Sequence, residues 1–246
     1  MSQIESFVVR LATKKDIDAL TDLHCSSFRP QDHVPVLLGR RYVKATYKWQ
    51  IEGKQAYTLV ADSNGRIVGL VAVCDGPFTL PMFKACLGEF ILSMMANPFL
   101  LFKKVLWRRM LRRPDLSDKN RAMADYPGFA QMTIGAVDSN FRGHGVFPAL
   151  VEATKTFSKE RGSRAIRAGV YKSNTSSRRV FIKGGWLETP ELETHDTVFY
   201  VAYLDPIFPS VIGLTLSSEQ KNQVSESSKE EAERPNCGGL SDDGRP

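Results

Sequence analysis

Apolar residues recur along this chain with two different periods, and the two periods alternate. The run Phe7–Leu11 has the period of a strand, and residues 13–16 (Thr-Lys-Lys-Asp) form a capping-box-like start for a helix. The apolar face of that helix would consist of Ile17, Leu20 and Leu23. The strand-like runs Tyr57–Ala61 and Ile67–Val73 flank Asn64-Gly65, a pair that supplies the positive φ angles of a tight hairpin. We therefore expect a strand, a helix and an antiparallel pair in the first part of the chain.

The alternation continues after the hairpin. A long apolar and basic stretch, residues 81–126, has helical character. The elements predicted after it are a strand Gln131–Val137, a helix that places Val146, Leu150, Ala153 and Phe157 on one face, a strand Arg164–Tyr171, a helix Asn174–Lys183 and a strand Thr197–Leu204. Gly184-Gly185 would end the second of these helices. This order predicts a mixed α/β domain around a central sheet.

The composition changes near the end of the chain. From Ser217 onward almost no large apolar residue occurs, which is typical of a disordered tail. Residues 207–246 carry four Lys/Arg against seven Asp/Glu, a net charge of −3. Because the whole chain has a net charge of +6, residues 1–206 have a net charge of +9. We therefore expect one domain, 1–206, and a tail, 207–246. A basic domain favours an anionic ligand, and charge alone does not distinguish nucleic acid, a lipid surface or a phosphorylated cofactor.

The cysteines and the apolar runs indicate the compartment in which the protein resides. Cys25, Cys74, Cys86 and Cys237 are scattered without short spacings, so we expect neither a disulfide framework nor a metal site. Residues 2–5 are polar and predict no secretory signal. The longest apolar stretch, Phe90–Phe102, is interrupted by Asn97-Pro98 and is shorter than the ~20 residues of a spanning helix. The expectation is a cytoplasmic protein.

The segment Arg142-Gly143-His144-Gly145 lies where a predicted strand gives way to a predicted helix. Free backbone N–H groups and the positive end of the helix dipole can bind a phosphate at such a junction. Glycines let the main chain approach the anion closely. A plain tight turn explains the same residues equally well. Neither a Walker-type Gly-Lys-Ser/Thr nor a full Gly-x-Gly-x-x-Gly is present, which disfavours the common nucleotide-binding folds.

Two segments together resemble the GNAT superfamily of acyl-CoA-dependent acyltransferases. Residues 137–147 are similar to its pyrophosphate-binding signature Arg/Gln-x-x-Gly-x-Gly/Ala, and residues 174–186 are similar to its Asn-x-x-Ala-x-x-Leu-Tyr-x-Lys-x-Gly-Phe. The resemblance covers about Val8 to Leu204. It implies a mixed, mostly antiparallel central sheet with a splayed strand pair, flanking helices, and a helical insertion (81–126) between the third and fourth strands.

The resemblance also implies a set of residues that bind acetyl-CoA. Main-chain groups of Ala136 and Val137 would pair with the pantetheine arm like an added strand. The loop that would hold the pyrophosphate through its amides consists of Arg142, Gly143, His144, Gly145, Val146 and Phe147. Asn174 would contact the pantetheine or cap its own helix. Phe181 would flank the cofactor or pack in the core, and Lys183 would reach a phosphate or stay in solvent.

The sequence departs from the family pattern at three positions. The last Gly/Ala of the loop is Phe147, the usual Tyr acid is Phe181, and the strand position that often holds Glu is Gln131. An amine acceptor near pKa ~10 must still lose a proton before it attacks. The remaining candidates for the base are Asp138, Tyr171, Asp75 and His195, and the leading catalytic pair is Tyr171 and Asp138.

The insertion contains a strongly basic segment. Asn97-Pro98 and Pro114 delimit a predicted helix, 97–113, with Phe99, Leu100, Leu106, Trp107, Met110 and Leu111 on its apolar side. The basic residues Lys104, Arg108, Arg109, Arg112 and Arg113 fall mainly on the other side. Three interpretations stay open: a lid packed on the sheet, a cap for an anionic or lipid-linked acceptor, and a helix lying in an anionic membrane surface.

Three functions follow from these patterns. The leading hypothesis is an acetyl-CoA-dependent N-acetyltransferase acting on a small-molecule or amino-sugar amine. The second is a GNAT-fold module that binds acyl-CoA and has lost its chemistry, because both usual proton carriers are absent. The third, a basic adaptor for nucleic acid, is the weakest, because the charge is concentrated in one insertion without a nucleic-acid-binding motif.

Overall fold

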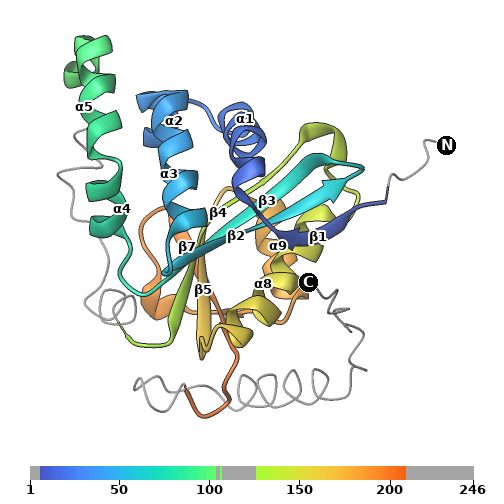
Figure 1. Ribbon diagram of the computed structural model, residues 1–246. Coiled ribbons are helices and arrows are strands. Elements are labelled where there is room, and N and C mark those ends of the chain that lie inside the picture. The colour runs from blue at the N-terminus through green and yellow to red at the C-terminus, as the bar shows by residue number, and fades with distance from the viewer. Residues whose placement is uncertain (1–5, 104–105, 107–125, 209–246) are drawn as a thin grey trace, which may run out of the picture.

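The computed structural model describes residues 6–103, 106 and 126–208. Its centre is a seven-stranded sheet in the order β1-β2-β3-β4-β5-β7-β6, in which only β4 and β5 run parallel (Figure 1). The strands are β1 (Val8–Leu11), β2 (Ala56–Ser63), β3 (Arg66–Asp75), β4 (Phe129–Val137), β5 (Ala165–Tyr171), β6 (Leu187–Glu188) and β7 (Thr197–Tyr203). The mixed, mostly antiparallel sheet expected from the sequence is confirmed.

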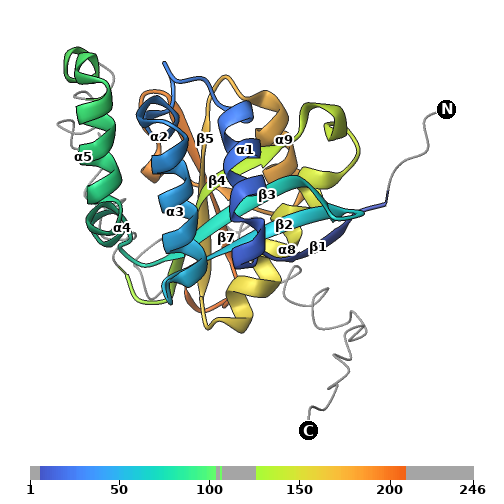
Figure 2. The same ribbon diagram turned by 45° about the horizontal axis from the view of Figure 1, so that its top comes forward.

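Helices cover both faces of this sheet. On one face lie α1 (Ile17–Ser27) and α3 (Arg40–Glu52), and on the other lie α8 (Val146–Glu160) and α9 (Thr175–Lys183). The short helix α2 (Val34–Leu38) precedes α3. Figure 2 shows α1, α3 and the pair α4 (Thr79–Ala85) and α5 (Leu87–Ala96) arranged side by side.

The first elements follow the sequence pattern closely. The Thr13 amide donates to the Asp16 carboxylate at 2.7 Å, which is the bond of a capping box that the acidic side chain accepts. The Thr13 hydroxyl also donates to this carboxylate, at 2.9 Å. The box opens a 3-10 turn, η1 (Lys14–Asp16), that leads directly into α1. The hairpin turn is also as predicted, because Asn64 and Gly65 have φ angles of 52° and 84°.

Helix α3 is an element that the sequence pattern did not predict. Its buried face includes Thr46 and Gln50 beside the apolar Tyr42, Val43 and Tyr47. Polar side chains on a buried face obscure the apolar period. The Thr46 hydroxyl donates a hydrogen bond to the carbonyl of Val43, and the Gln50 side chain accepts one from Thr58 on β2.

A bulge and a divergence distinguish β4 from a regular strand. Its pairing with β3 shifts register so that Ala72 faces Ile134 and Val73 faces Met132, which leaves Thr133 as the extra residue. Its parallel pairing with β5 ends at Met132 and Ala168, although both strands continue. The splayed strand pair expected from the resemblance is therefore present.

The insertion contains helices, but not in the expected arrangement. After α4 and α5, Pro98 opens a 3-10 helix, η2 (Pro98–Phe102), and Lys103 is extended, so the helix predicted over 97–113 is interrupted at its start. Leu100 and Leu106 are buried with Leu38 and Tyr42 of α2 and α3 rather than on the sheet. Of the three interpretations left open, the lid packed on the sheet is wrong for these two side chains. Lys104, Arg108, Arg109, Arg112 and Arg113 lie outside the described residues.

The described part of the chain ends beyond the expected domain boundary at residue 206. Phe208 is fully buried beside Tyr126 and Phe129. The packed domain therefore includes Phe208, and the tail from residue 209 lies outside the described residues. Within residues 6–103, 106 and 126–208, no single helix has the length and apolar composition needed to cross a membrane.

Candidate functional site

The main chain of β4 beyond its bulge has a defined orientation. The amide of Asp138 donates to the carbonyl of Val68 on β3, at 2.9 Å. Because main-chain groups alternate in an antiparallel ladder, Ala136 also directs its N–H and C=O toward β3. Gly135 and Val137 direct theirs to the opposite side, where β5 diverges. The expectation that the Ala136 main chain is available for an added strand was therefore wrong, because its groups face β3, whereas those of Gly135 and Val137 face the diverging side.

The loop after β4 presents its backbone at the start of α8. Gly143 and Gly145 have φ angles of 82° and 81°, and a Cβ added at either would meet no described atom within 4 Å. Gly145 caps α8, and the amides of Val146 and Phe147 are in the first turn, where no intrahelical acceptor exists. The left-handed conformation, more than a close contact, is the reason for glycine at these two positions. Free amides at a helix N-terminus suit an anionic group.

Arg142 and His144 occupy this loop in different ways. The Arg142 side chain turns back to β4 and donates from Nε to the Val137 carbonyl, at 3.2 Å. Arg142 thus holds the loop against the end of the strand. His144 is exposed, and its amide is 3.4 Å from the Phe141 carbonyl.

Phe147, which replaces a small residue of the family pattern, packs in the core. A Cβ added to Gly135 would lie 2.7 Å from Cε2 of Phe147, so this ring occupies the space that a side chain on β4 would fill. The ring also meets Phe181 edge-on, with centroids 6.0 Å apart. The absence of a side chain at Gly135 therefore accommodates the large residue at Phe147.

Phe181 is a core residue. It is 1% exposed, stacks on Tyr200 with centroids 5.5 Å apart, and meets Trp186 edge-on. The Tyr200 hydroxyl receives a hydrogen bond from Arg178 and donates one to Glu188. Burial raises the pKa of this Tyr200 hydroxyl. A tyrosine at position 181 would thus enter a closed aromatic cluster.

Asn174 and Lys183 lie at the two ends of α9. The Asn174 Oδ1 accepts from the Ser177 amide at 3.1 Å, which is the N-cap role expected as one of its alternatives. Lys183 is exposed, and the carbonyl of its neighbour Gly184 accepts from Lys155. Because Lys155 follows Val146 by nine residues, this end of α9 lies about 13 Å along α8 from its first turn. A contact between either side chain and a cofactor stays a prediction.

Asp138 is engaged in local structure. Its carboxylate accepts from the Asn140 amide at 2.9 Å and from Arg66 at 2.6 Å. The Asn140 amide and then the Arg66 guanidinium hold the pKa of this carboxyl below its usual range. A low pKa makes a weak base, so Asp138 is poorly suited to accept a proton from an ammonium group.

The other base candidates lie at opposite ends of the sheet. Tyr171 ends β5 on the splayed side and is exposed, and His195 is exposed in the loop that leads to its neighbour strand β7. Asp75 instead pairs with Ala130, seven residues before Val137, and is bound to Arg161. At ~3.3 Å per residue this separates Asp75 by about 20 Å from the loop 142–147, but it places Asp75 opposite Ala130, the neighbour of Gln131. A role of Tyr171, His195 or Asp75 as base stays a prediction.

The position of the family's glutamate holds a polar pair. Gln131 accepts from Nη2 and Nε of Arg167, at 2.6 and 3.2 Å. Arg167 faces Gln131 across the last paired residues of β4 and β5, and only 3% of it is exposed. The ring of Phe199 lies 5.7 Å from the guanidinium carbon. A buried positive charge therefore lies where the two strands begin to diverge.

The comparisons with known proteins agree with this geometry. No family model matches the sequence, and no curated protein matches it significantly. Among solved structures, the N-acetyltransferase PaiA from Thermoplasma acidophilum in complex with coenzyme A matches with a TM-score of 0.53 at 8% identity, over 80% of this chain and 99% of that one. A candidate acetyltransferase from Salmonella typhimurium with acetyl-CoA matches with a TM-score of 0.51 at 15% identity, over 81% and 95% of the two chains.

A third match is the GNAT domain of the S. lividans protein PAT, with a TM-score of 0.50 at 17% identity, over 82% of this chain and 98% of that domain. Matches of this kind show the fold. The chain therefore has the fold of the GNAT acyltransferases, as the two sequence segments indicated.

Two residues of this site were missed in the sequence. Gly135 carries a signal, because glycine inside a predicted strand often marks a close approach of another group. Arg167 carries one too, since it is the only charged residue within the otherwise apolar strand Ala165–Val170. Neither signal predicts which residue is contacted. The contacts of Phe147 with Gly135 and of Gln131 with Arg167 follow only from the register of β4 on β3 and β5.

Proposed function

We propose that this protein transfers an acetyl group from acetyl-CoA to a small-molecule or amino-sugar amine. The observation that carries the proposal is the combination of two features at one end of β4. The strand bulges at Thr133 and diverges from β5, and the loop that follows it places two left-handed glycines before the first amides of α8. The first feature suits an extended amide-containing chain, and the second suits a diphosphate.

The residues divide this binding task between main chain and helix terminus. Gly135 and Val137 offer N–H and C=O groups toward the diverging side, which would pair with the amides of the pantetheine arm like an added strand. Val146 and Phe147 offer amides to the pyrophosphate. Arg142 supports the loop through its hydrogen bond to Val137.

Transfer requires a neutral amine, whose nitrogen attacks the thioester carbon while the carbon–sulfur bond breaks and coenzyme A leaves as a thiolate. The proton of the ammonium form goes to a base or to water before the attack. The second N–H proton, which the nitrogen loses as the amide forms, goes to the thiolate or to water. Among the candidates we favour Tyr171, because it is exposed at the end of the diverging strand, whereas Asp138 is ion-paired with Arg66. The cationic Arg167 would favour the neutral form of an amine bound nearby.

The test combines calorimetry of acetyl-CoA binding with a thioester-cleavage assay on a panel of amines. Gly145→Ala should weaken acetyl-CoA binding at least tenfold, because alanine resists a φ of 81° and displaces the amides that follow. Gly162→Ala is the matched control, since Gly162 has a φ of 83° and equally open surroundings at the far end of α8. Equal affinities in the two variants would remove the loop from the site.

A second function, an acyl-CoA-binding module without catalysis, is favoured by one observation. The two positions that hold proton carriers in the family are occupied here by the buried Phe181 and by Gln131 bound to Arg167. Calorimetric binding of acetyl-CoA without thioester cleavage for any amine would favour the module. Turnover that falls in Tyr171→Phe while binding persists would favour the enzyme.

A further inference from the structure

The exposed side of α5 is apolar. Leu87, Ile91, Leu92 and Met95 follow one another along this side, and Met95 is 74% exposed. The polar members of the helix, Glu89 and Ser93, are instead half-buried on the side that faces the protein. A surface helix of a globular protein normally has the opposite distribution, with polar groups toward water.

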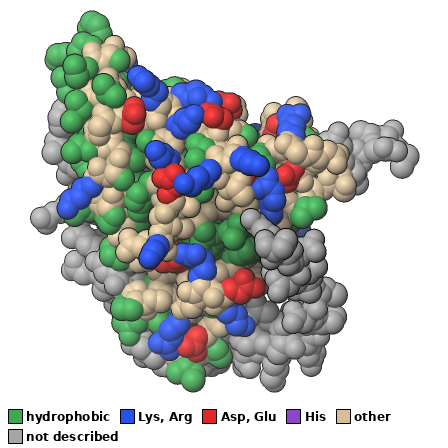
Figure 3. Space-filling model, viewed as in Figure 1, with side chains coloured by type: hydrophobic (Ala, Val, Ile, Leu, Met, Phe, Trp, Pro, Cys, Tyr) green, Lys and Arg blue, Asp and Glu red, His purple; other side chains and the backbone are tan. Residues whose placement is uncertain are grey.

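The apolar surface continues onto η2. Phe99 and Phe102 are 73% and 81% exposed, and Leu101 is exposed beside them. We call the set Leu87, Ile91, Leu92, Met95, Phe99 and Phe102 the apolar ridge. In Figure 3 hydrophobic side chains gather over the α4–α5 arm at the upper left of the molecule. A contiguous exposed apolar surface of this kind indicates an interaction site.

The ridge is not a badly packed core, because the arm has its own packed side. Cys86, Leu100 and Leu106 are buried against Leu38 and Tyr42 of α2 and α3. Met82, Phe90 and Met94 cover the same cluster. The arm is therefore held by one side, and the ridge projects from the other.

The charge around the ridge is positive. Residues 84–113 contain seven Lys/Arg and one acidic residue, Glu89, which faces the protein. Lys84, in the last turn of α4, and Lys103, directly after η2, are exposed. The other five lie outside the described residues, and only their place in the sequence, directly after the ridge, enters the argument.

We propose that the apolar ridge inserts into the interfacial layer of a membrane that contains anionic lipid, with the neighbouring lysines and arginines at the headgroups. Apolar side chains flanked by cations are the combination that such a surface binds. A second copy of this chain fits less well, because a ridge-to-ridge contact would bring together two surfaces that carry exposed lysines, in a protein that already carries +6. By length and composition α4 and α5 also pass the test for a membrane segment as a pair bent by 60°.

This orientation would place the membrane beside the α2–α3 side of the molecule, against which the arm packs. The proposal does not rest on acyl transfer, because docking requires only the ridge and its charges. The experiment can therefore fail while the proposed function stands, and the reverse is also possible.

The experiment is flotation of the full chain with vesicles of phosphatidylcholine alone or mixed with phosphatidylserine. The wild type should float with the mixed vesicles and float much less with the neutral ones. Ile91→Glu and Met95→Glu should each reduce the bound fraction about tenfold or more, because each replaces an apolar side chain that the membrane would cover by a charge of the same sign as the lipid. Both positions are exposed, so the melting temperature and acetyl-CoA affinity should match those of the wild type.

The matched control is Val8→Glu, which places the same charge at an exposed apolar position on β1, away from the arm in both views. This variant should float like the wild type. Three results would overturn the proposal: no flotation with mixed vesicles, full flotation of Met95→Glu, or a dimer on size-exclusion chromatography that Met95→Glu dissociates. The last result would assign the ridge to a second copy of the chain.

Discussion

The contact between Phe147 and Gly135 joins the helix start to the strand that would hold the cofactor. Gly135→Ala places a methyl group 2.7 Å from the Phe147 ring, which must then move. We expect a loss of about 1–3 kcal/mol in the free energy of unfolding, together with weaker acetyl-CoA binding, because the ring and the Gly135 main chain share the site. Chemical denaturation and calorimetry measure the two effects.

A double-mutant cycle isolates this contact. Phe147→Ala removes the ring, so Gly135→Ala should lower the free energy of unfolding by less in that background. The difference should be about 0.5 kcal/mol or more, which is the usual interaction energy of residues in contact. Gly88→Ala on α5 is a suitable control, because a Cβ there meets no atom of the described residues within 4 Å. Additive effects of the two substitutions would show that Phe147 does not occupy the Gly135 space.

Gln131 offers a test of whether a family-like carboxylate can act as base in this chain. In Gln131→Glu the new carboxylate would lie beside the Arg167 guanidinium, which now donates to Gln131 at 2.6 Å. The opposite charge would hold the pKa of the new carboxyl low, so the variant should gain no turnover at neutral pH. The pH profile of kcat/KM for acetyl-CoA and an active amine measures this. A rise in turnover with a new ascending limb would show that Arg167 leaves the carboxylate basic.

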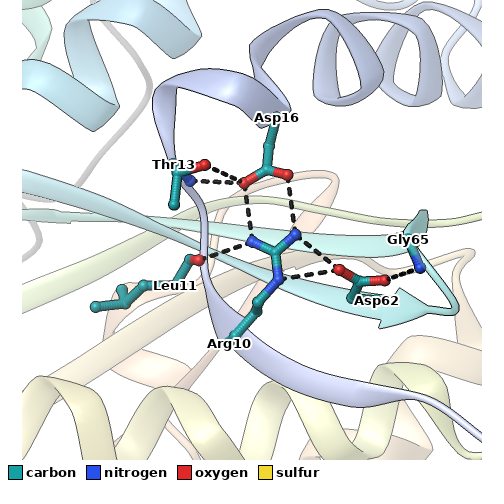
Figure 4. A network of polar contacts seen from close by, with 6 residues as sticks. All are labelled: Arg10, Leu11, Thr13, Asp16, Asp62 and Gly65. Carbon is teal, nitrogen blue, oxygen red and sulfur yellow. Dashed lines mark hydrogen bonds and ion pairs between the residues drawn. The ribbon is translucent and has the colours of Figure 1, made fainter. Parts of the chain in front are cut away.

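Among the elements, the junction of β1, η1 and β2 depends on one arginine. Figure 4 shows Arg10 between two carboxylates, with Asp16 at 2.8 and 2.9 Å and Asp62 at 2.8 and 3.0 Å. The hydrogen bond from Arg10, aided by those from Thr13, lowers the pKa of Asp16 to about 2. This contribution to stability is present above the ordinary pKa of 3.8 and is lost as the pH falls toward 2.

We therefore expect Asp16→Asn to lower the free energy of unfolding at pH 7 by about 2 kcal/mol, since the carboxylate is largely buried. Urea denaturation at pH 7 and pH 3 provides the measurement, and the difference between wild type and variant should shrink at the lower pH. Asp32→Asn is the control, because its pair with Arg29 is exposed and contributes little. A loss as small as that of the control would show that the network is not stabilising.

Helices α1 and α3 meet at His24, a second titrating group. His24 is 3% exposed, its Nδ1 is 2.8 Å from the Tyr47 hydroxyl, and its Nε2 is 3.4 Å from His33. Burial, and then the charge of His33, lowers the pKa of His24 from 6.5 to about 3. Below pH 6.5 this histidine is therefore protonated in the unfolded chain, whereas in the folded protein it stays neutral down to about pH 3. As the pH falls through that window, the free energy of unfolding decreases by up to ~1.4 kcal/mol per pH unit.

His24→Gln should flatten this dependence, because glutamine does not titrate in the window and can still bond to Tyr47. Urea denaturation between pH 7 and pH 4 measures the slope. His195→Gln, at an exposed histidine, should leave the slope unchanged. A slope that persists in His24→Gln would place the titrating group elsewhere.

The elements differ in how far the sequence could predict them. Strands and helices with a clear apolar period, such as β3 and α8, and turns with a fixed residue chemistry, such as Asn64-Gly65, were predicted correctly. The backbone of the loop 142–147 belongs to the same class, because two glycines between a strand and a helix indicate a left-handed conformation. Its role in binding a cofactor stays a prediction. Helix α3 was missed because its buried face includes Thr46 and Gln50, whose partners are set by tertiary structure.

The parts of the site that depend on register could not be predicted. The bulge at Thr133 leaves no mark in the run Gln131–Val137, yet it determines that the main-chain groups of Gly135, and not those of Ala136, face β5. The same holds for the Gln131–Arg167 pair, which joins residues 36 apart.

At the scale of the whole molecule, the folded unit extends at least to Phe208. Phe208 is fully buried, stacks on Phe129 with centroids 6.0 Å apart, and lies under the guanidinium of Arg164, 4.6 Å from the ring centroid. Removal of residues 217–246, whose composition provides little apolar surface to bury, should leave the melting temperature and acetyl-CoA affinity unchanged. Removal of residues 207–246 should instead destabilise the protein.

Phe208→Ala in the full chain separates the buried ring from the rest of the tail. Loss of a buried phenylalanine side chain costs about 3–5 kcal/mol, which corresponds to a fall of roughly 6–20 °C in the melting temperature of a domain this size. Ile207→Ala is the control, because its side chain is 68% exposed and its removal opens no cavity. Differential scanning calorimetry on the two point variants and the 217–246 deletion gives the comparison. If the deletion lowers the melting temperature and Phe208→Ala does not, residues 217–246 must contribute packing that their composition does not predict.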